Sequence, residues 1–282
     1  MERPNFPDLL RAANEGDAKA QMTLGTHYAW GVCTDRNLAE AIRWYRMSAQ
    51  QGYAHAQFTL AGHIANGDGI QKDTANALTW LTKAAKQNYA PAQHALGCWY
   101  ACGRAVVKDL DAAFRWFQKA AEQGFGDAQV ALGHCYLIGK GTHEHPVEAV
   151  KWFRKAEVNT GSADAQFMLG YCYKEGIGVM QDRSLAIDWL AKAAAQNHQD
   201  ARKTLSTYAN PQEIRDSATD KKQLLSPAKG GCLFAMVLTL ATFLNLISAI
   251  STKYQLLRQE KPDTYLRASH GRLYVSPILW KR

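Results

Sequence analysis

Apolar residues recur along this chain with a helical period that glycine interrupts at regular places. Between residues 162 and 197, Ala165, Leu169 and Tyr173 fall at positions i, i+4 and i+8, which predicts a helix with one apolar face. A Gly-x-Gly turn that begins at Gly176 ends this helix, and a second helical pattern follows it. The stretch therefore predicts two antiparallel helices joined by a short turn.

The same pattern occurs five times. An Ala-Gln dipeptide recurs with steps of 36, 36, 36 and 37 residues, and a tryptophan in the second helix keeps the same steps. The alanines are Ala20, Ala56, Ala92, Ala128 and Ala165, and the tryptophans are Trp44, Trp80, Trp116, Trp152 and Trp189. Such a period marks stacked units that cannot cover their apolar faces alone. We expect these alanines and tryptophans to form the core between neighbouring hairpins.

The full pattern, A-x-x-x-L-G-x-x-Y-x-x-G-x-G-V-x-x-D-x-x-x-A-x-x-W-x-x-K-A-A, resembles the Sel-1-like repeat, a relative of the tetratricopeptide repeat. The resemblance covers residues 17–208 and implies an all-α fold, a right-handed α/α solenoid of five repeats. Some positions depart from the pattern. The second loop glycine is Cys33 in repeat one and Ala105 in repeat three, the helix glycine is Ala61 in repeat two, and His145 stands near the usual Asp of repeat four.

Half-repeats are expected at both ends of the solenoid. Residues 1–16 match a lone second helix, with the polar Asp8 in the tryptophan column, as suits a terminal cap. At the other end, Ala201 and Leu205 restore the spacing of a first helix. Residues 209–229 are polar and are interpreted as a linker outside the repeats.

Residues 230–252 contain no charged side chain. Because spanning a bilayer takes about 20 mostly apolar residues, the sequence predicts a single transmembrane helix here. A buried helix packed on the last repeat is the alternative. The polar residues of the segment recur every three positions, so they point in changing directions around the helix axis. An amphipathic helix would instead keep its polar residues on one face. The polar residues of segment 230–252 could face a second transmembrane helix, which would form a homo-oligomer through this segment, or they could bond their own backbone.

The net charge of +8 is unevenly spread. Lys and Arg outnumber Asp and Glu by 22 to 20 up to Leu205 and by 11 to 5 from Ser206 onward. A nearly neutral solenoid argues against nucleic acid as a partner. The basic C-terminal tail, residues 253–282, suits a place beside anionic lipid headgroups.

The compartment is inferred from two absences. The N-terminus has no apolar stretch of signal-peptide length, and the six cysteines do not recur as a pair in each repeat. Both favour repeats in the cytoplasm on a single-pass membrane protein. Basic residues flank segment 230–252 on both sides, and the positive tail opposes this orientation.

No catalytic motif for a metalloprotease, a nucleotide-binding loop or a serine hydrolase occurs, so no enzyme and no cofactor are expected. Cys98, His134 and Tyr171 share one column of successive first helices, with Cys102 one turn beyond Cys98. Zinc binding or nucleophilic catalysis by Cys98, Cys102 and His134 is the weaker alternative. The spacing matches no known zinc finger, and nothing at fixed spacing would orient a catalytic base.

Residues of the first helices that packing does not use are expected to line a neutral concave groove for a protein or peptide. The candidate contact residues are His63, His94, Gln129, His134, Gln166 and Tyr171. The resemblance implies an adaptor, so we expect a non-enzymatic, membrane-tethered scaffold. The alternative is a bacterial immunity protein that masks a toxic enzyme, since repeats of this type occur in such inhibitors.

Overall fold

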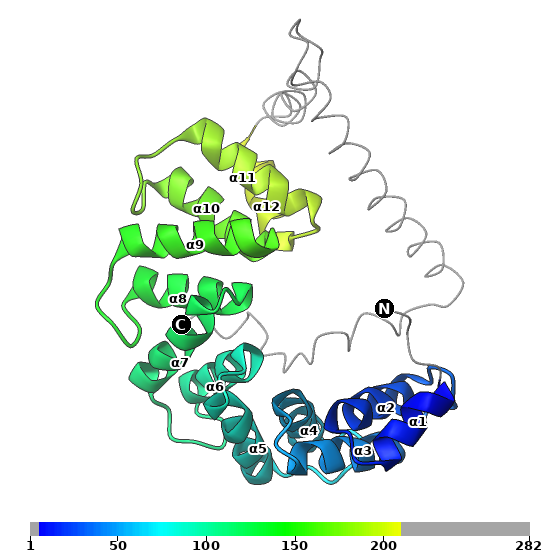
Figure 1. Ribbon diagram of the computed structural model, residues 1–282. Coiled ribbons are helices and arrows are strands. Elements are labelled where there is room, and N and C mark those ends of the chain that lie inside the picture. Colours follow the sequence, from blue (N-terminus) through cyan, green and yellow to red (C-terminus); the bar gives the residue numbers. More distant parts are fainter. Residues whose placement is uncertain (1–5, 210–282) are drawn as a thin grey trace, which may run out of the picture. The chain divides into compact units, whose positions relative to one another are not determined.

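The computed structural model describes residues 6–209. In this part of the chain all regular structure is α-helical, as predicted (Figure 1). The helices are α1 (Phe6–Asn14), α2 (Ala18–Trp30), α3 (Leu38–Gln50), α4 (Ala54–Asn66), α5 (Thr74–Lys86), α6 (Ala90–Cys102), α7 (Leu110–Glu122), α8 (Gly126–Ile138), α9 (Pro146–Thr160), α10 (Ala163–Glu175), α11 (Arg183–Ala195) and α12 (Gln199–Tyr208).

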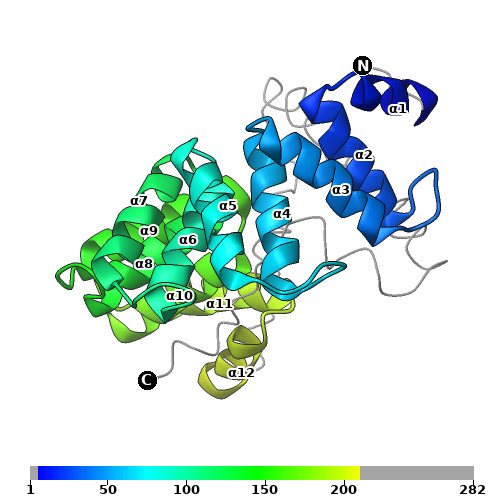
Figure 2. The same ribbon diagram turned by 90° about the horizontal axis from the view of Figure 1, so that it is seen from below.

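Consecutive helices pack against one another, and both views show the hairpins following one another in chain order (Figure 1, Figure 2). The first helices of the five hairpins are α2, α4, α6, α8 and α10, and the second helices are α3, α5, α7, α9 and α11. The half-repeats α1 and α12 stand before and after them. The prediction of a helical repeat solenoid with half-repeat ends is therefore confirmed.

The predicted segment 230–252 and the tail 253–282 lie outside the described residues, as does the linker beyond Ala209. Among the helices between residues 6 and 209, none is long and apolar enough to cross a membrane.

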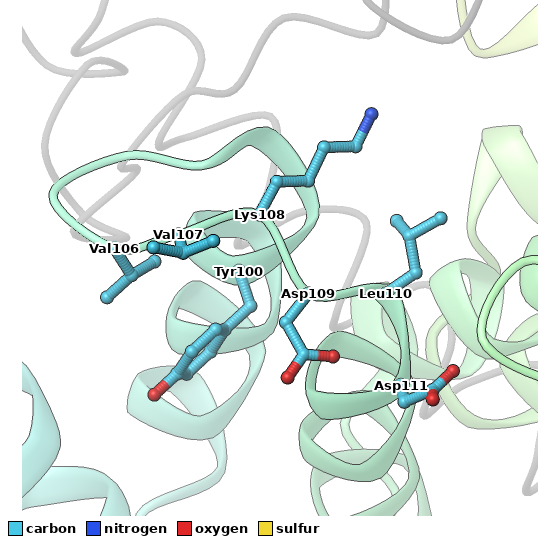
Figure 3. Close-up of a pocket in the computed structure, with 7 residues that line it drawn as sticks. All are labelled: Tyr100, Val106, Val107, Lys108, Asp109, Leu110 and Asp111. Atoms are coloured by element: carbon cyan, nitrogen blue, oxygen red, sulfur yellow. The ribbon is translucent and has the colours of Figure 1, made fainter.

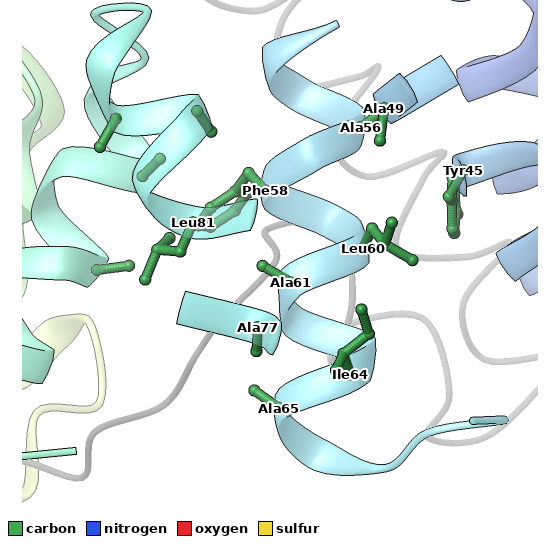
Figure 4. Close-up of a cluster of buried hydrophobic side chains, with 14 of the residues drawn as sticks. Tyr45, Ala49, Ala56, Phe58, Leu60, Ala61, Ile64, Ala65, Ala77 and Leu81 are labelled. Carbon is green, nitrogen blue, oxygen red and sulfur yellow. The ribbon is translucent and has the colours of Figure 1, made fainter. Parts of the chain in front are cut away.

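In four of the five hairpins, a large side chain of the second helix lies over a glycine of the first. A Cβ on Gly133 would lie 2.5 Å from the ring of Phe153, so only glycine permits this approach. Gly25 with Tyr45 and Gly97 with Phe117 repeat the contact. Repeat two has Ala61 in place of the glycine, and its partner position holds Leu81 rather than an aromatic ring (Figure 4). Repeat five has a leucine, Leu190, over Gly170, so a smaller partner does not by itself account for the alanine.

The tryptophans are less buried than we expected. Trp44 is buried, but in the other four repeats the indole is only half-buried, and the residue after it fills the core instead. A lysine three positions later covers the exposed face of the ring. Its Nζ lies 3.9 Å from the ring centroid in the pair Lys155–Trp152 and 3.6 Å in Lys192–Trp189. The indoles thus pack on one side and hold a cation on the other.

Candidate functional site

The glutamine of each Ala-Gln pair is buried and ties three helices together. Gln57 of α4 donates from Nε2 to the carbonyl of Ala49 in α3, at 3.1 Å. Its Oε1 accepts from Nε2 of Gln87, just after α5, at 2.7 Å. The same pair of bonds recurs at Gln21, Gln93 and Gln129. Because a buried amide needs both of its polar ends satisfied, the polar side chain here is a structural link.

Two of the predicted contact residues belong to this set. Gln129 is 2% exposed and bonds Ala121 and Asn159, whereas Gln166 is 6% exposed and bonds Glu157 and Gln196. Their amides serve the packing of neighbouring repeats. We therefore do not retain Gln129 and Gln166 as contact residues.

The three predicted histidines are half-buried against aromatic rings. His63 stacks on Tyr45 of the preceding repeat with ring centroids 5.6 Å apart. His94 lies 5.6 Å from Phe117, and His134 meets Phe153 edge-on at 5.5 Å. Each histidine thus fills space between helices.

Burial lowers the pKa of His63 and of His94 and lowers that of His134 to about 4. At His134 the carboxylate of Asp164 opposes the shift and the ammonium of Lys140 adds to it. All three imidazoles are therefore neutral at pH 7.

Tyr171 of α10 is the most exposed of the six candidates, at 37%. It shares its column with Thr26, Gly62, Cys98 and His134 on the four preceding first helices. A Cβ on Gly62 would meet no atom within 4 Å, so the space over α4 at this column is open.

Within residues 6–209, the buried cysteines are held in the thiol form. The Sγ atom of Cys98 lies 3.7 Å from Nε2 of His94, but burial raises the pKa of this thiol to about 12, and that of Cys135 likewise. A nucleophile needs the thiolate, and this shift favours the thiol. Cys102 is exposed and contacts the carbonyl of Trp99. Within residues 6–209, no three His, Cys, Asp or Glu residues are placed to hold a metal ion, so Cys98, Cys102 and His134 gain no support as ligands.

A hollow of about 710 Å³ lies beside the turn of repeat three, between the end of α6 and the start of α7 (Figure 3). Tyr100, Val106 and Leu110 supply apolar surface, and Lys108 points away from the two carboxylates at Asp109 and Asp111 in this view. Asp109 accepts from the backbone N–H of Ala112 at 2.8 Å as the helix cap. A hollow of about 540 Å³ lies at the same positions of repeat two. These hollows repeat with the fold and bring no catalytic groups together.

The repeat pattern, the hairpins and their links identify the family, and a family model agrees. The Sel1 repeat model matches residues 18–53, 54–89, 90–125, 126–157 and 163–198. The chain belongs to the Sel1 repeat family. A comparison with curated proteins finds no match.

Solved Sel1 repeat structures resemble the chain over most of its length. A protective antigen of uropathogenic Escherichia coli is 34% identical with a TM-score of 0.68, over 73% of this chain and 44% of that one. A Sel1 repeat protein of Oxalobacter formigenes is 34% identical with a TM-score of 0.65, over 71% of this chain and 58% of that one. The chain thus spans about half the length of these two relatives.

An immunity protein of Pseudomonas aeruginosa is 21% identical with a TM-score of 0.48, over 71% of this chain and 76% of that one. At this similarity it carries no argument about function.

The Sel1 repeats of this chain differ most at their turns. A Cβ on Gly141 in repeat four would lie 2.1 Å from the carbonyl oxygen of Leu110, so glycine is required there. Cys33 and Ala105 adopt the same left-handed conformation without being glycine, with φ of 61° and 57°. His145 replaces the capping aspartate of repeat four and makes no side-chain cap bond, whereas its backbone N–H still bonds the carbonyl of Tyr136, as that of Asp109 bonds Tyr100 in repeat three.

Proposed function

We propose that this Sel1 repeat protein is a non-enzymatic scaffold that binds a protein partner on its first helices. The distribution of charge is the observation that carries the proposal. Helices α4 and α6 contain no Asp, Glu, Lys or Arg, and α2 and α8 contain one each, whereas α10 and every second helix of the five hairpins carry at least two such residues. Burying uncharged surface in an interface avoids the cost of desolvating ions.

The contact surface we propose is the column formed by Thr26, Gly62, Cys98, His134 and Tyr171. It begins with small side chains and ends with Tyr171, a residue type enriched at interface hot spots. The open space over Gly62 admits a close approach of a partner to helix α4. His63 and His94 border this column and remain contact candidates at its edge.

The proposal also includes a membrane tether, residues 230–252, which is supported by the sequence alone. Residues 230–252 are uncharged and long enough to span a bilayer. We propose a single-pass protein whose repeats lie in the cytoplasm. A tether of this kind would raise the concentration of the bound partner at the membrane. From the sequence of the same segment, we also propose that the chain can form a homo-oligomer through it.

A photocrosslinking residue in the full chain tests the contact surface. It replaces Tyr171 in one variant and Val158 in the matched control, because Val158 is 80% exposed and lies off the column. We expect a discrete protein adduct from position 171, competed away by unmodified chain, and none from position 158. Identical adducts from both positions would overturn the proposed surface.

The identity of the adduct separates the two sequence-based hypotheses. A toxic enzyme whose activity the chain suppresses would favour the inhibitor alternative, and a non-enzymatic or membrane protein would favour the scaffold. The tether is tested separately by flotation of the full chain with vesicles.

A further inference from the structure

Exposed apolar side chains gather at one edge of the repeats. We call the edge that carries the interhelical turns the loop edge. Of the seven large apolar residues that are exposed between residues 6 and 209, five lie at the loop edge: Val107, Ile138, Val147, Met180 and Leu185. All five belong to repeats three to five. Tyr171 lies on the face of α10, and Val158 lies near the end of α9, at the opposite edge.

The two most exposed of these residues occupy the same position of their turns. Val107 is 88% exposed and Met180 is 89% exposed, and each stands four residues after the glycine that ends its first helix. In repeats one, two and four the corresponding residues are Asp35, Gln71 and His143. The apolar side chain is therefore no requirement of the turn. Isolated apolar surface residues are common, but the uneven gathering of five along one edge is the observation from which the inference starts.

The turns of neighbouring repeats interlock, so the loop edge is continuous. Gly141 in the turn of repeat four packs on the carbonyl of Leu110, where α7 of repeat three begins. Gly178 in the turn of repeat five packs on the carbonyl of Pro146, where α9 of repeat four begins. Each turn therefore rests on the start of the second helix before it.

The described chain also ends at the loop edge. Helix α12 runs in the direction of a first helix, and its last residue, Tyr208, lies beside the start of α11. The Nη2 atom of Arg183 donates to the carbonyl of Tyr208 at 2.7 Å, and the guanidinium lies 4.6 Å from its ring centroid. Lys174 lies 5.4 Å from the same ring. Aromatic rings flanked by cations are typical of membrane interfaces.

We propose that the loop edge of repeats three to five faces a lipid surface, with Val107 and Met180 entering the headgroup region. The inference rests on the proposed tether, because segment 230–252 follows only 20 residues after Ala209. The two edges are about 20 Å apart, the length of a 13-residue helix. A tether that leaves from the loop edge favours its approach to the bilayer. Single apolar side chains on separate turns suit a fluid surface, which needs no matching pocket.

The test uses the full chain with one reporter cysteine. Cys33→Gly and Cys102→Asn remove the two exposed thiols and take the residues found at the same positions of repeat two. Cys232→Ala removes the cysteine that lies outside the described residues. The remaining cysteines have pKa values raised to about 12 by burial and stay unreactive: Cys98, Cys135 and Cys172. In this background Val107→Cys and Met180→Cys carry an environment-sensitive fluorophore. Val158→Cys is the matched control, an exposed valine at the opposite edge.

The labelled chains are mixed with phosphatidylcholine and phosphatidylglycerol vesicles that contain brominated acyl chains. If positions 107 and 180 lie 5–10 Å deep, we expect them to be quenched about threefold more than position 158, with a blue-shifted emission. Flotation of the same samples reports whether the chain binds the vesicles at all.

The combined readouts separate this inference from the tether. If the chains float and positions 107 and 180 respond like position 158, the tether stands and the lipid-facing edge is overturned. If the chains do not float and no position responds, both are overturned. A response at 107 and 180 that occurs without vesicles and grows with protein concentration would assign the edge to a second copy of the chain and overturn the lipid assignment.

Discussion

Replacing His134 should change how the stability of the repeats depends on pH. The ring is packed edge-on against Phe153, and burial lowers its pKa from 6.5 to about 4. The substitution His134→Thr removes the titrating group and installs the residue found at this column in repeat one, Thr26. Thr26 occupies this column on a first helix of the same fold, so the variant should fold.

The sign follows from proton uptake. In the unfolded chain the imidazole takes up a proton below pH 6.5, whereas the folded chain resists until about pH 4. The unfolded state therefore binds more protons in this window, and stability falls as the pH is lowered from 6.5 to 4. At 1.36 kcal/mol per pKa unit, the native chain loses about 3 kcal/mol through this one group between pH 7.5 and 4.

Urea unfolding of the full chain and of His134→Thr, followed by tryptophan fluorescence at pH 7.5, 6, 5 and 4, measures the difference. The variant loses the contact with Phe153 at every pH. The informative quantity is therefore how the difference in unfolding free energy between the two chains changes with pH. His63 and His94 are present in both chains, so their contributions cancel in the difference. Between pH 7.5 and 4, we expect the unfolding free energy of the native chain to fall by about 3 kcal/mol more than that of the variant. Equal changes in the two chains would refute the burial of a neutral His134.

Three further substitutions test the links between repeats by the same unfolding assay. Gln93→Leu should cost about 1–3 kcal/mol, because it removes the bonds to Ala85 and Gln123 and leaves the buried carbonyl of Ala85 without this donor, whereas the exposed Gln123 keeps its bonds to Asn88 and Lys119. A cost below 0.5 kcal/mol would show that water replaces them. Ala105→Gly should stabilise by about 0.5–1 kcal/mol, because φ at this position is 57°, and a loss of stability would contradict this. Gly141→Ala should cost about 2 kcal/mol or more, because its Cβ would lie 2.1 Å from a backbone oxygen, and unchanged stability would contradict the close packing of the turns.

The sequence predicted the parts of the fold that repeat. A 36-residue period with Ala, Leu, Gly and Trp at fixed offsets determines hairpins that must stack, because no single hairpin covers its own apolar face. The half-repeats also followed from spacing alone: Ala201 and Leu205 are buried on α12 as expected, and Leu9 and Ala13 are buried on α1.

The sequence could not predict which polar and aromatic residues are buried between the helices. Gln129 and Gln166 have the composition of a binding surface, and only their burial and their bond partners show them to be structural. The sequence did contain an indication of this role, because a glutamine follows the repeating alanine in all five repeats. A residue that recurs in every repeat is usually needed for the fold. The half-buried tryptophans could not be foreseen from spacing, because residues Trp152 and Phe153 both fit an apolar face and differ by 100° around the helix.

The residues free to vary between repeats are therefore the better guide to function. The glutamine links, the glycine under the large side chain and the asparagine or aspartate caps recur and are used by the fold. The columns that change are the one from Thr26 to Tyr171 on the first helices and the one from Asp35 to Met180 at the turns. In the fifth repeat the first column holds Tyr171 and the second holds Met180, both large and exposed. A partner on the first column and a membrane at the second would contact different sides of the same hairpins, so one repeat can serve both without sharing a side chain.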